Sequence, residues 1–237
     1  MPLHQTFKVK LVNGIDDDDL DRIARAGAVI AHNPISNLRL GSGVMPFRAI
    51  RDRGISIALG TDEAIADDAV NMWAVIKMAG LIHNITDPDY EKWPSALEVL
   101  DCLIAGGHRA MRSGNIGAIA RGQAADLCLI DLDTLAFTPL NDIHRQLVYC
   151  ENGSSVRLTM IDGRVVFSDG CVRTVDEQAI RAEARQLAHD RQAGLRAAAS
   201  EAEEWSSSYR QMYLKAAGQD LGMTRWVGDP VGQGMKR

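Results

Sequence analysis

The sequence contains few of the features that mark secreted, membrane or redox proteins. Its four cysteines are scattered without a CxxC pair, so neither a structural zinc site nor a redox motif is indicated. No apolar run approaches the roughly 20 residues that span a bilayer, and the first residues lack the apolar core of a signal peptide. We therefore expect a cytoplasmic protein with no membrane partner, whose cysteines are buried free thiols.

Acidic residues outnumber basic ones, 31 to 26. The formal net charge is −5 and the pI is about 5.7. Because a phosphate-binding face needs clustered Lys and Arg, we expect no nucleic-acid partner. The remaining composition, 46% apolar and 24% charged, is ordinary for a globular protein, and 237 residues suit one large domain or two small ones.

Short apolar segments alternate with helical ones over about residues 16–110. Residues 28–31 and 55–60 have the composition of strands that are buried on both faces. Such strands, alternating with helices, predict an α/β fold with a parallel sheet. The expected helices cover residues 17–25, 46–53, 71–81 and 96–110.

From about residue 116 the pattern becomes that of a β structure. Asp162-Gly163 predicts a hairpin turn, because both residues can adopt a positive φ. Residues 175–217 are rich in Ala, Arg, Gln and Glu and predict one or two exposed helices. The expected strands cover residues 127–131, 155–161 and 164–167.

Two polar residues directly follow the first two expected strands. Asp62 ends the segment LGTD, and His32 follows residues 28–31. Barrels of this class place their active sites at the carboxyl ends of the strands. Asp62 could there ligate a divalent metal or act as a general base, or it could cap the next helix. His32 could bind substrate or a proton, or it could hydrogen-bond within its own loop.

Together these segments make a more specific pattern. HNPISNLRLGSG begins at His32, and ISIALGTD ends at Asp62, thirty residues later; GAIARGQAADLCLID and RVVFSDG follow downstream. The arrangement resembles the amidohydrolase superfamily, in the branch that holds methylthioadenosine/adenosylhomocysteine deaminases, guanine and cytosine deaminases and triazine hydrolases. The resemblance covers roughly residues 16–170. It implies an α/β fold, namely the C-terminal portion of a (β/α)8 metal-dependent hydrolase barrel followed by β-sandwich strands and C-terminal helices.

The resemblance also implies boundaries and roles. The expected parts are a partial TIM-like barrel over residues 1–115, a β-sandwich segment over 116–174, and C-terminal helices and a tail over 175–237. Asp62 matches the aspartate that binds the divalent metal, zinc or iron, and takes the proton of the metal-bound water. His32 matches a histidine near the substrate pocket.

Other residues of the same two motifs are less clearly assigned. Glu63 stands where the family usually has Gly. Either it contacts an amino group of the substrate, or it caps the next helix together with Asp67 and Asp68. Ser36 and Asn37 match a structural part of the loop.

Most of the family's other metal and catalytic residues are missing. The family has an HxH pair, a His followed three residues later by a Glu, and a sixth-strand His, whereas this sequence contains no HxH. The usual spacing from His32 puts the sixth-strand His at Leu11, and Asn13 fits only if two residues are deleted. A hydrolytic metal site needs about three or four protein ligands. We therefore expect this chain alone to be inactive and its metal centre to be completed by a longer native chain or a separate N-terminal half.

Three hypotheses follow. The first is a metal-dependent amidohydrolase of the deaminase or chlorohydrolase type, which hydrolyses non-peptide carbon–nitrogen bonds in a small heterocyclic substrate. The second is a non-catalytic remnant, and the third is an interaction module that docks on a full-length relative. The expected partners are accordingly a small heterocyclic substrate and either a missing N-terminal half or a second copy in a homo-oligomer.

Overall fold

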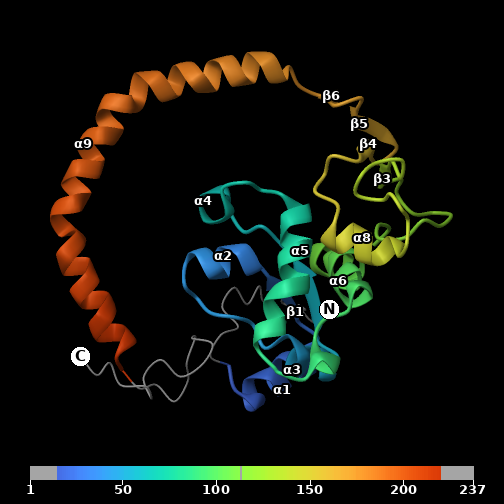
Figure 1. The fold of residues 1–237 in the computed structure, drawn as a ribbon, viewed down its shortest axis with the longest axis horizontal. Helices are drawn as coiled ribbons and strands as arrows, with labels where there is room; N and C mark the ends of the chain where they lie inside the picture. The colour runs from blue at the N-terminus through green and yellow to red at the C-terminus, as the bar shows by residue number, and fades with distance from the viewer. Residues whose placement is uncertain (1–14, 113, 220–237) are drawn as a thin grey trace, which may run out of the picture.

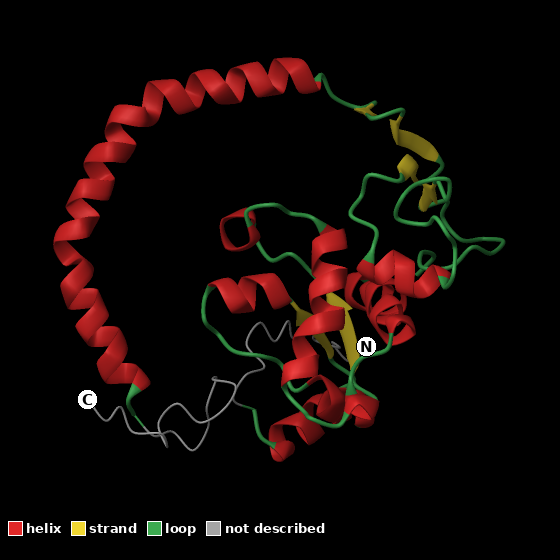
Figure 2. Ribbon diagram, viewed as in Figure 1, coloured by secondary structure: helices red, strands yellow, loops and turns green. Residues whose placement is uncertain are grey.

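The computed structural model describes residues 15–112 and 114–219 (Figures 1 and 2). These residues form a helix-rich body around two parallel strands, a small antiparallel sheet and one long C-terminal helix. The predicted α/β class is thus confirmed. Leu11 and Asn13, the two positions considered for the sixth-strand histidine, lie outside the described residues.

The parallel strands are β1 (Val29–His32) and β2 (Ser56–Leu59), at the two places where the apolar runs predicted strands. In the register, His32 lies opposite Leu59. Parallel strands need a long crossover connection, which here contains α2 (Pro34–Arg39) and α3 (Phe47–Asp52). Both strands end at the same edge, and the residues that follow them are therefore neighbours.

Helices make up most of the body. α1 (Asp17–Arg25) has the predicted bounds, and the side chain of its N-cap residue, Asp16, accepts a hydrogen bond from the backbone N–H of Asp19. The other helical segments before the second sheet are α4 (Ala64–Asp67), α5 (Met72–Ile82), the 3₁₀ turns η1 (His83–Ile85) and η2 (Tyr90–Lys92), α6 (Ala96–Asp101), the π-helical turn η3 (Cys102–Gly106) and α7 (Gly107–Met111). α8 (Ile143–Tyr149) lies between the first and second strands of the antiparallel sheet and was not predicted.

The main apolar core lies between the parallel strands and the helices before and after them. Ile30 and Ile57 contribute from the strands, and Leu20 and Ile50 contribute from α1 and α3. Each is at most 2% exposed, and burial of a side chain of this size contributes about 1.5–3 kcal/mol. This core fixes the two strand ends from which the candidate site is built.

The predicted helix over residues 96–110 is interrupted by the π-helical turn η3. Its last residue, Gly106, lies so close to β2 that a Cβ atom there would collide with the backbone carbonyl of Ile57. The wider turn lets the helix bring a glycine, with no side chain, against the strand. The interruption therefore follows from tertiary packing, which helical periodicity does not reveal.

The second sheet is antiparallel, in the order β3 (Leu127–Ile130), β4 (Val156–Ile161), β5 (Arg164–Ser168) and β6 (Cys171–Val172). The hairpin between β4 and β5 turns at Asp162 and Gly163, whose φ angles are +48° and +77°. The first three strands and this turn agree with the sequence prediction.

The cysteines do not behave as expected. Cys102 is buried in the main core, but Cys128, Cys150 and Cys171 are exposed. All four are free thiols in the structure. The expectation of buried thiols is therefore wrong for three of them, because they lie in the exposed small sheet and at the end of α8 rather than in the core.

α9 (Glu177–Ala217) is a single helix of 41 residues that follows the small sheet. It begins at Asp176, whose side chain accepts a hydrogen bond from the N–H of Ala179, and none of its residues is buried. Figure 1 shows it as an arc that runs around the outside of the body. No helix in the described part of the chain is long and apolar enough to cross a membrane.

Candidate active site

Asp62 lies three residues beyond the end of β2, at the edge where β1 also ends. Its φ is +67°, in the left-handed region that costs a residue with a side chain about 1–2 kcal/mol. Asp and Asn tolerate this conformation better than most residues. Its side chain is half-buried. A strained, half-buried carboxylate at this edge fits the predicted functional position.

The hydroxyl of Ser36 holds this carboxylate. Ser36 Oγ donates a hydrogen bond of 2.9 Å to Asp62 Oδ2. Ser36 belongs to α2, which begins at Pro34, a residue well suited to the first position of a helix. Since Ser36 is only 2% exposed, its hydroxyl position is fixed by packing. The structural role implied for Ser36 thus takes the form of orienting Asp62.

A second contact connects the two strand ends. The N–H of Gly60 donates to the carbonyl of His32 at 3.0 Å. A Cβ atom at Gly60 would lie 2.6 Å from the side-chain Oδ1 of Asn33. The glycine before Thr61 and Asp62 is therefore needed for the buried amide of Asn33 to approach the strand.

His32 points into the body rather than into solvent. It is 2% exposed, and its Nε2 lies 3.1 Å from Nε2 of His83, which is 3% exposed. The ring of Phe47 packs 4.9 Å from that of His83, measured between centroids. Neither Nδ1 atom has a hydrogen-bond partner among the described residues.

Burial keeps both imidazoles neutral. It lowers the pKa of His83 to about 4, and burial together with the neighbouring His83 lowers the pKa of His32 well below its ordinary value. One neutral ring can donate its Nε2–H to the Nε2 of the other. The geometry gives His32 a packing partner in His83. The substrate contact predicted for His32 stays a prediction.

Glu63 is exposed and stands at the N-cap position of α4, but its side chain makes no capping hydrogen bond there. Of the two acids expected to help it cap, Asp67 is buried, whereas Asp68 is exposed and paired with Arg39. The side chain of Glu63 therefore does not cap α4. Its predicted contact with substrate stays a prediction.

The described residues do not by themselves make a metal centre. No group of three or more His, Cys, Asp or Glu side chains in residues 15–112 and 114–219 could hold a metal ion. Zinc in hydrolytic enzymes has three protein ligands, so such a site would need ligands from outside the described residues.

A hollow lies at the amino end of β2, whereas Asp62 follows the carboxyl end of this strand. It is lined by residues at the start of β2 and on α3 and α6, including Ser56. Two ion pairs border it, Arg48 with Glu98 at 2.8 Å and Arg51 with Asp101 at 2.9 Å. This hollow therefore joins helices at the amino end of the strand and is not part of the Asp62 site.

Sequence reasoning missed two features of the site. It did not foresee the contact of His83 with His32, 51 positions away. It also gave Ser36 no contact with Asp62. No sequence signal predicts the histidine pair. The serine contact could have been sought, because residues after neighbouring parallel strands share an edge.

Curated relatives of this chain are deaminases. The 5-methylthioadenosine/S-adenosylhomocysteine deaminase of Desulfovibrio desulfuricans is 38% identical over 183 residues, which are 76% of this chain and 41% of that protein. The 5′-deoxyadenosine deaminase of Methanosarcina mazei is 31% identical over 176 residues, which are 74% of this chain and 40% of the relative. The chain thus spans about two fifths of the length of these relatives.

Solved structures and a family profile agree with these relatives. A zinc-bound adenosine deaminase from Xanthomonas campestris has a TM-score of 0.70 and 28% identity, covering 74% of this chain and 40% of that one. The zinc complex of an atrazine chlorohydrolase from Arthrobacter aurescens TC1 has a TM-score of 0.70 and 27% identity, covering 74% and 39%. The profile described as the amidohydrolase family matches residues 4–166. The chain belongs to the amidohydrolase family.

Proposed function

We propose that this chain contributes the Asp62 edge of an amidohydrolase that deaminates a purine nucleoside. The curated relatives named above act, by their names, on 5-methylthioadenosine, S-adenosylhomocysteine and 5′-deoxyadenosine. In such a hydrolysis water supplies the oxygen that forms the new carbon–oxygen bond, the exocyclic carbon–nitrogen bond breaks, and ammonia leaves. The two parallel strands would be the closing strands of a (β/α)8 barrel, and the antiparallel sheet would belong to a β-sandwich.

The contact between Ser36 and Asp62 carries this proposal. It joins the loops after the two strands and holds a carboxylate at the edge where barrels place their active sites. A packing role alone would not require a half-buried acid in a strained conformation. Within the proposal Asp62 ligates the metal and accepts a proton, while Glu63 and His32 lie on the substrate side.

The metal would be divalent, with zinc as the first candidate because both solved relatives named above contain it. Its other ligands would come from residues outside the described ones or from another polypeptide. A metal held by several ligands lowers the pKa of bound water, which is the chemistry it would supply.

A chimera tests the proposal. This chain would replace the matched segment of the Desulfovibrio desulfuricans deaminase, so that the relative supplies the remaining ligands. We expect bound zinc, measured by plasma emission, and ammonia release from adenosine or methylthioadenosine. Asp62→Asn should remove most of the zinc and lower kcat/KM by about 100- to 10,000-fold, the usual contribution of a proton-transfer group.

Asp68→Asn is the matched control, because it changes an exposed acid six residues away and should leave both measurements unchanged. A second chimera that carries only residues 28–63 covers the case in which the first does not fold. Folded chimeras without zinc, or an active Asp62→Asn variant, would reject the proposal. The absence of zinc would favour the non-catalytic remnant or a module that docks on a full-length relative, whereas an active Asp62→Asn variant would mean that Asp62 is not required for the reaction.

A further inference from the structure

The long helix α9 buries none of its residues against the rest of the described chain. Its 41 residues extend about 60 Å at 1.5 Å per residue, and none is buried. Large apolar side chains are nevertheless present, and Trp205 and Tyr209 are 59% and 63% exposed. Exposed apolar surface of this extent on a helix commonly marks an interaction site.

These apolar side chains form one continuous stripe. It contains eleven positions at spacings of three or four residues, and 36 residues in ten steps give the 3.6-residue repeat of an α-helix. Ten of the eleven are apolar, and Arg191 is the exception. At 100° per residue the stripe is roughly 100° wide. The positions are Ile180, Ala184, Leu187, Arg191, Leu195, Ala198, Ala202, Trp205, Tyr209, Met212 and Ala216.

The two halves of the stripe differ in side-chain size. Its C-terminal half contains the bulky Trp205, Tyr209 and Met212, whereas its N-terminal half contains Ala184 and Leu187. A parallel partner would place large side chains against large ones. An antiparallel partner would place the large half of each helix against the smaller half of the other, and helices pack best when large and small residues alternate across the contact.

We propose that α9 pairs with α9 of a second copy of this chain, antiparallel and centred on Ala198. This inference rests on α9 alone and does not depend on the proposed deaminase function. With Ala198 opposite its counterpart, Ala184 faces Met212 and Leu187 faces Tyr209. Nine of the eleven stripe positions then meet stripe positions, whereas Leu195 meets Glu201 and Ala202 meets Gly194, each next to a stripe position.

The arginine in the stripe supports this orientation. In the antiparallel pair Arg191 faces Trp205, and a guanidinium over an indole ring is a favourable cation–π contact. In a parallel pair in register, Arg191 would face its own counterpart inside the apolar contact, where two unpaired cations are costly. The single charged position in the stripe thus distinguishes the two arrangements.

Charges beside the stripe give the same result. The same register brings Glu183 near Lys215 of the other copy, on one flank of the stripe. In a parallel pair Glu183 and Glu201, which flank the stripe, would each lie beside their own copy.

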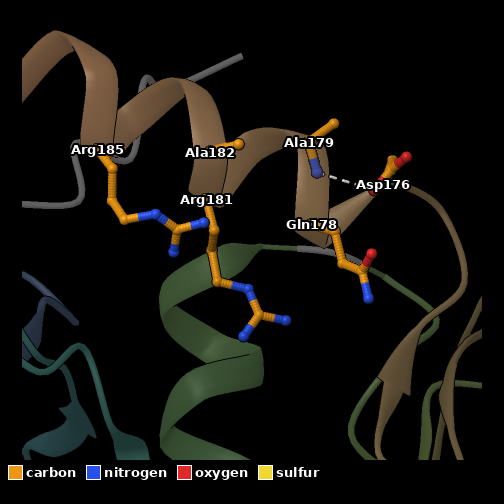
Figure 3. A pocket seen from close by; sticks show the side chains of 6 residues that line it. All are labelled: Asp176, Gln178, Ala179, Arg181, Ala182 and Arg185. Carbon is orange, nitrogen blue, oxygen red and sulfur yellow. Dashed lines mark hydrogen bonds between the residues drawn. The ribbon is translucent and has the colours of Figure 1, made fainter.

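At the start of α9, a row of polar side chains lies outside the apolar stripe. Figure 3 shows the side chains of Gln178, Arg181 and Arg185 extending to the same side of the first turns. At 100° per residue these three side chains lie about 90° to 150° from the middle of the stripe. This polar row would therefore face away from the contact and stay in water.

The contact would be large enough for a stable dimer. A strip about 60 Å long and about 10 Å wide, the dimensions of one helix, gives about 600 Å² on each copy. The sum reaches the roughly 1,200 Å² at which specific protein interfaces begin. A second copy of the same chain can therefore cover the stripe along its whole length.

The mass of the full-length chain in solution is the first test. We expect twice the monomer mass of 25.8 kDa by light scattering after size-exclusion chromatography. Ala202→Glu puts two carboxylates into the stripe contact and should weaken dimerisation at least tenfold, or by about 1.4 kcal/mol or more. Ala193→Glu makes the same substitution on the opposite face of α9 and should leave the dimer intact. Circular dichroism checks that both variants keep the helix.

Engineered disulfides test the orientation. Ala184→Cys combined with Met212→Cys should crosslink two copies on oxidation, because these positions face each other in the antiparallel pair. Ala184→Cys alone should not crosslink above the background of the wild-type chain, which contains three exposed cysteines. A monomeric wild-type chain, a dimer unaffected by Ala202→Glu, efficient crosslinking by Ala184→Cys alone, or no crosslinking by the double variant would each overturn the proposal.

Discussion

The body around β1 and β2 is stabilised in a different way from the helix α9. The body is built from short helices, such as α1 with nine residues, and each is held by apolar side chains in a common core. α9 has 41 residues and buries none of them. Short helices are marginal in isolation and depend on packing, whereas a long, alanine-rich helix can persist through its own hydrogen bonds. Substitutions should therefore act strongly in the body and weakly in α9.

Truncation of a leucine should give the largest difference between the two regions. Leu20 of α1 is 2% exposed, and Leu20→Ala should lower the free energy of unfolding by about 2–5 kcal/mol, because it leaves a cavity in the main core. Leu214 of α9 is 49% exposed and lies outside the apolar stripe. Leu214→Ala should therefore change the free energy of unfolding by less than about 0.5 kcal/mol. Urea unfolding followed by tryptophan fluorescence measures both. Equal losses would show that α9 is packed as tightly as the body.

Acid should destabilise the body through its buried histidines. His83 is neutral in the folded chain down to about pH 4, whereas in the unfolded chain it takes up a proton near pH 6.5. Its contribution to stability is therefore complete above pH 6.5 and is lost as the pH falls toward 4, at a cost of up to about 3 kcal/mol. His32 acts in the same direction.

Urea midpoints measured between pH 7 and pH 4 test this expectation. His83→Gln should flatten the dependence on pH. His189→Gln removes an exposed histidine of α9 and should leave that dependence unchanged. The same slope in wild type and His83→Gln would mean that the loss of stability in acid arises elsewhere.

Replacing a glycine by alanine should give the smallest difference in the free energy of unfolding between the two regions. The change should be destabilising in the body and stabilising in α9. Gly60→Ala would bring a Cβ atom within 2.6 Å of Asn33 Oδ1 and should cost about 1–3 kcal/mol. Gly194 lies inside α9 with nothing within 4 Å of an added Cβ, so Gly194→Ala should stabilise the helix by up to about 1 kcal/mol. Thermal melts followed by circular dichroism would show both effects. Destabilisation by Gly194→Ala would contradict the open surroundings of this glycine.

The elements that were predicted well are those with a strong local signal. The acidic first turn of α1, the apolar runs of β1 and β2 and the Asp162-Gly163 turn each specify their structure within a few residues. α9 was expected as one or two helices and is one. The break at η3 and the helix α2 were missed. The former depends on contact between Gly106 and β2, and the latter begins in an Asn-Pro segment that was expected to be part of a loop.

The candidate site was predictable in position but not in its contacts. The rule that residues after parallel strands share an edge placed Asp62 near the HNPISN loop, and the hydrogen bond from Ser36 agrees with that expectation. The burial of His32 against His83 could not be predicted. It depends on where the end of α5 returns to the strands, which periodicity does not specify.

The π-helical turn at η3 makes the length of this helical region as important as its composition. A π turn contains one residue more than an α turn, and each residue of a helix advances the direction of its side chains by about 100°. Deleting one residue between Cys102 and Ala105 would turn every later side chain of α7 relative to β2 and would move Gly106 away from Ile57. Insertions and deletions should therefore be tolerated far less well here than in the exposed α9.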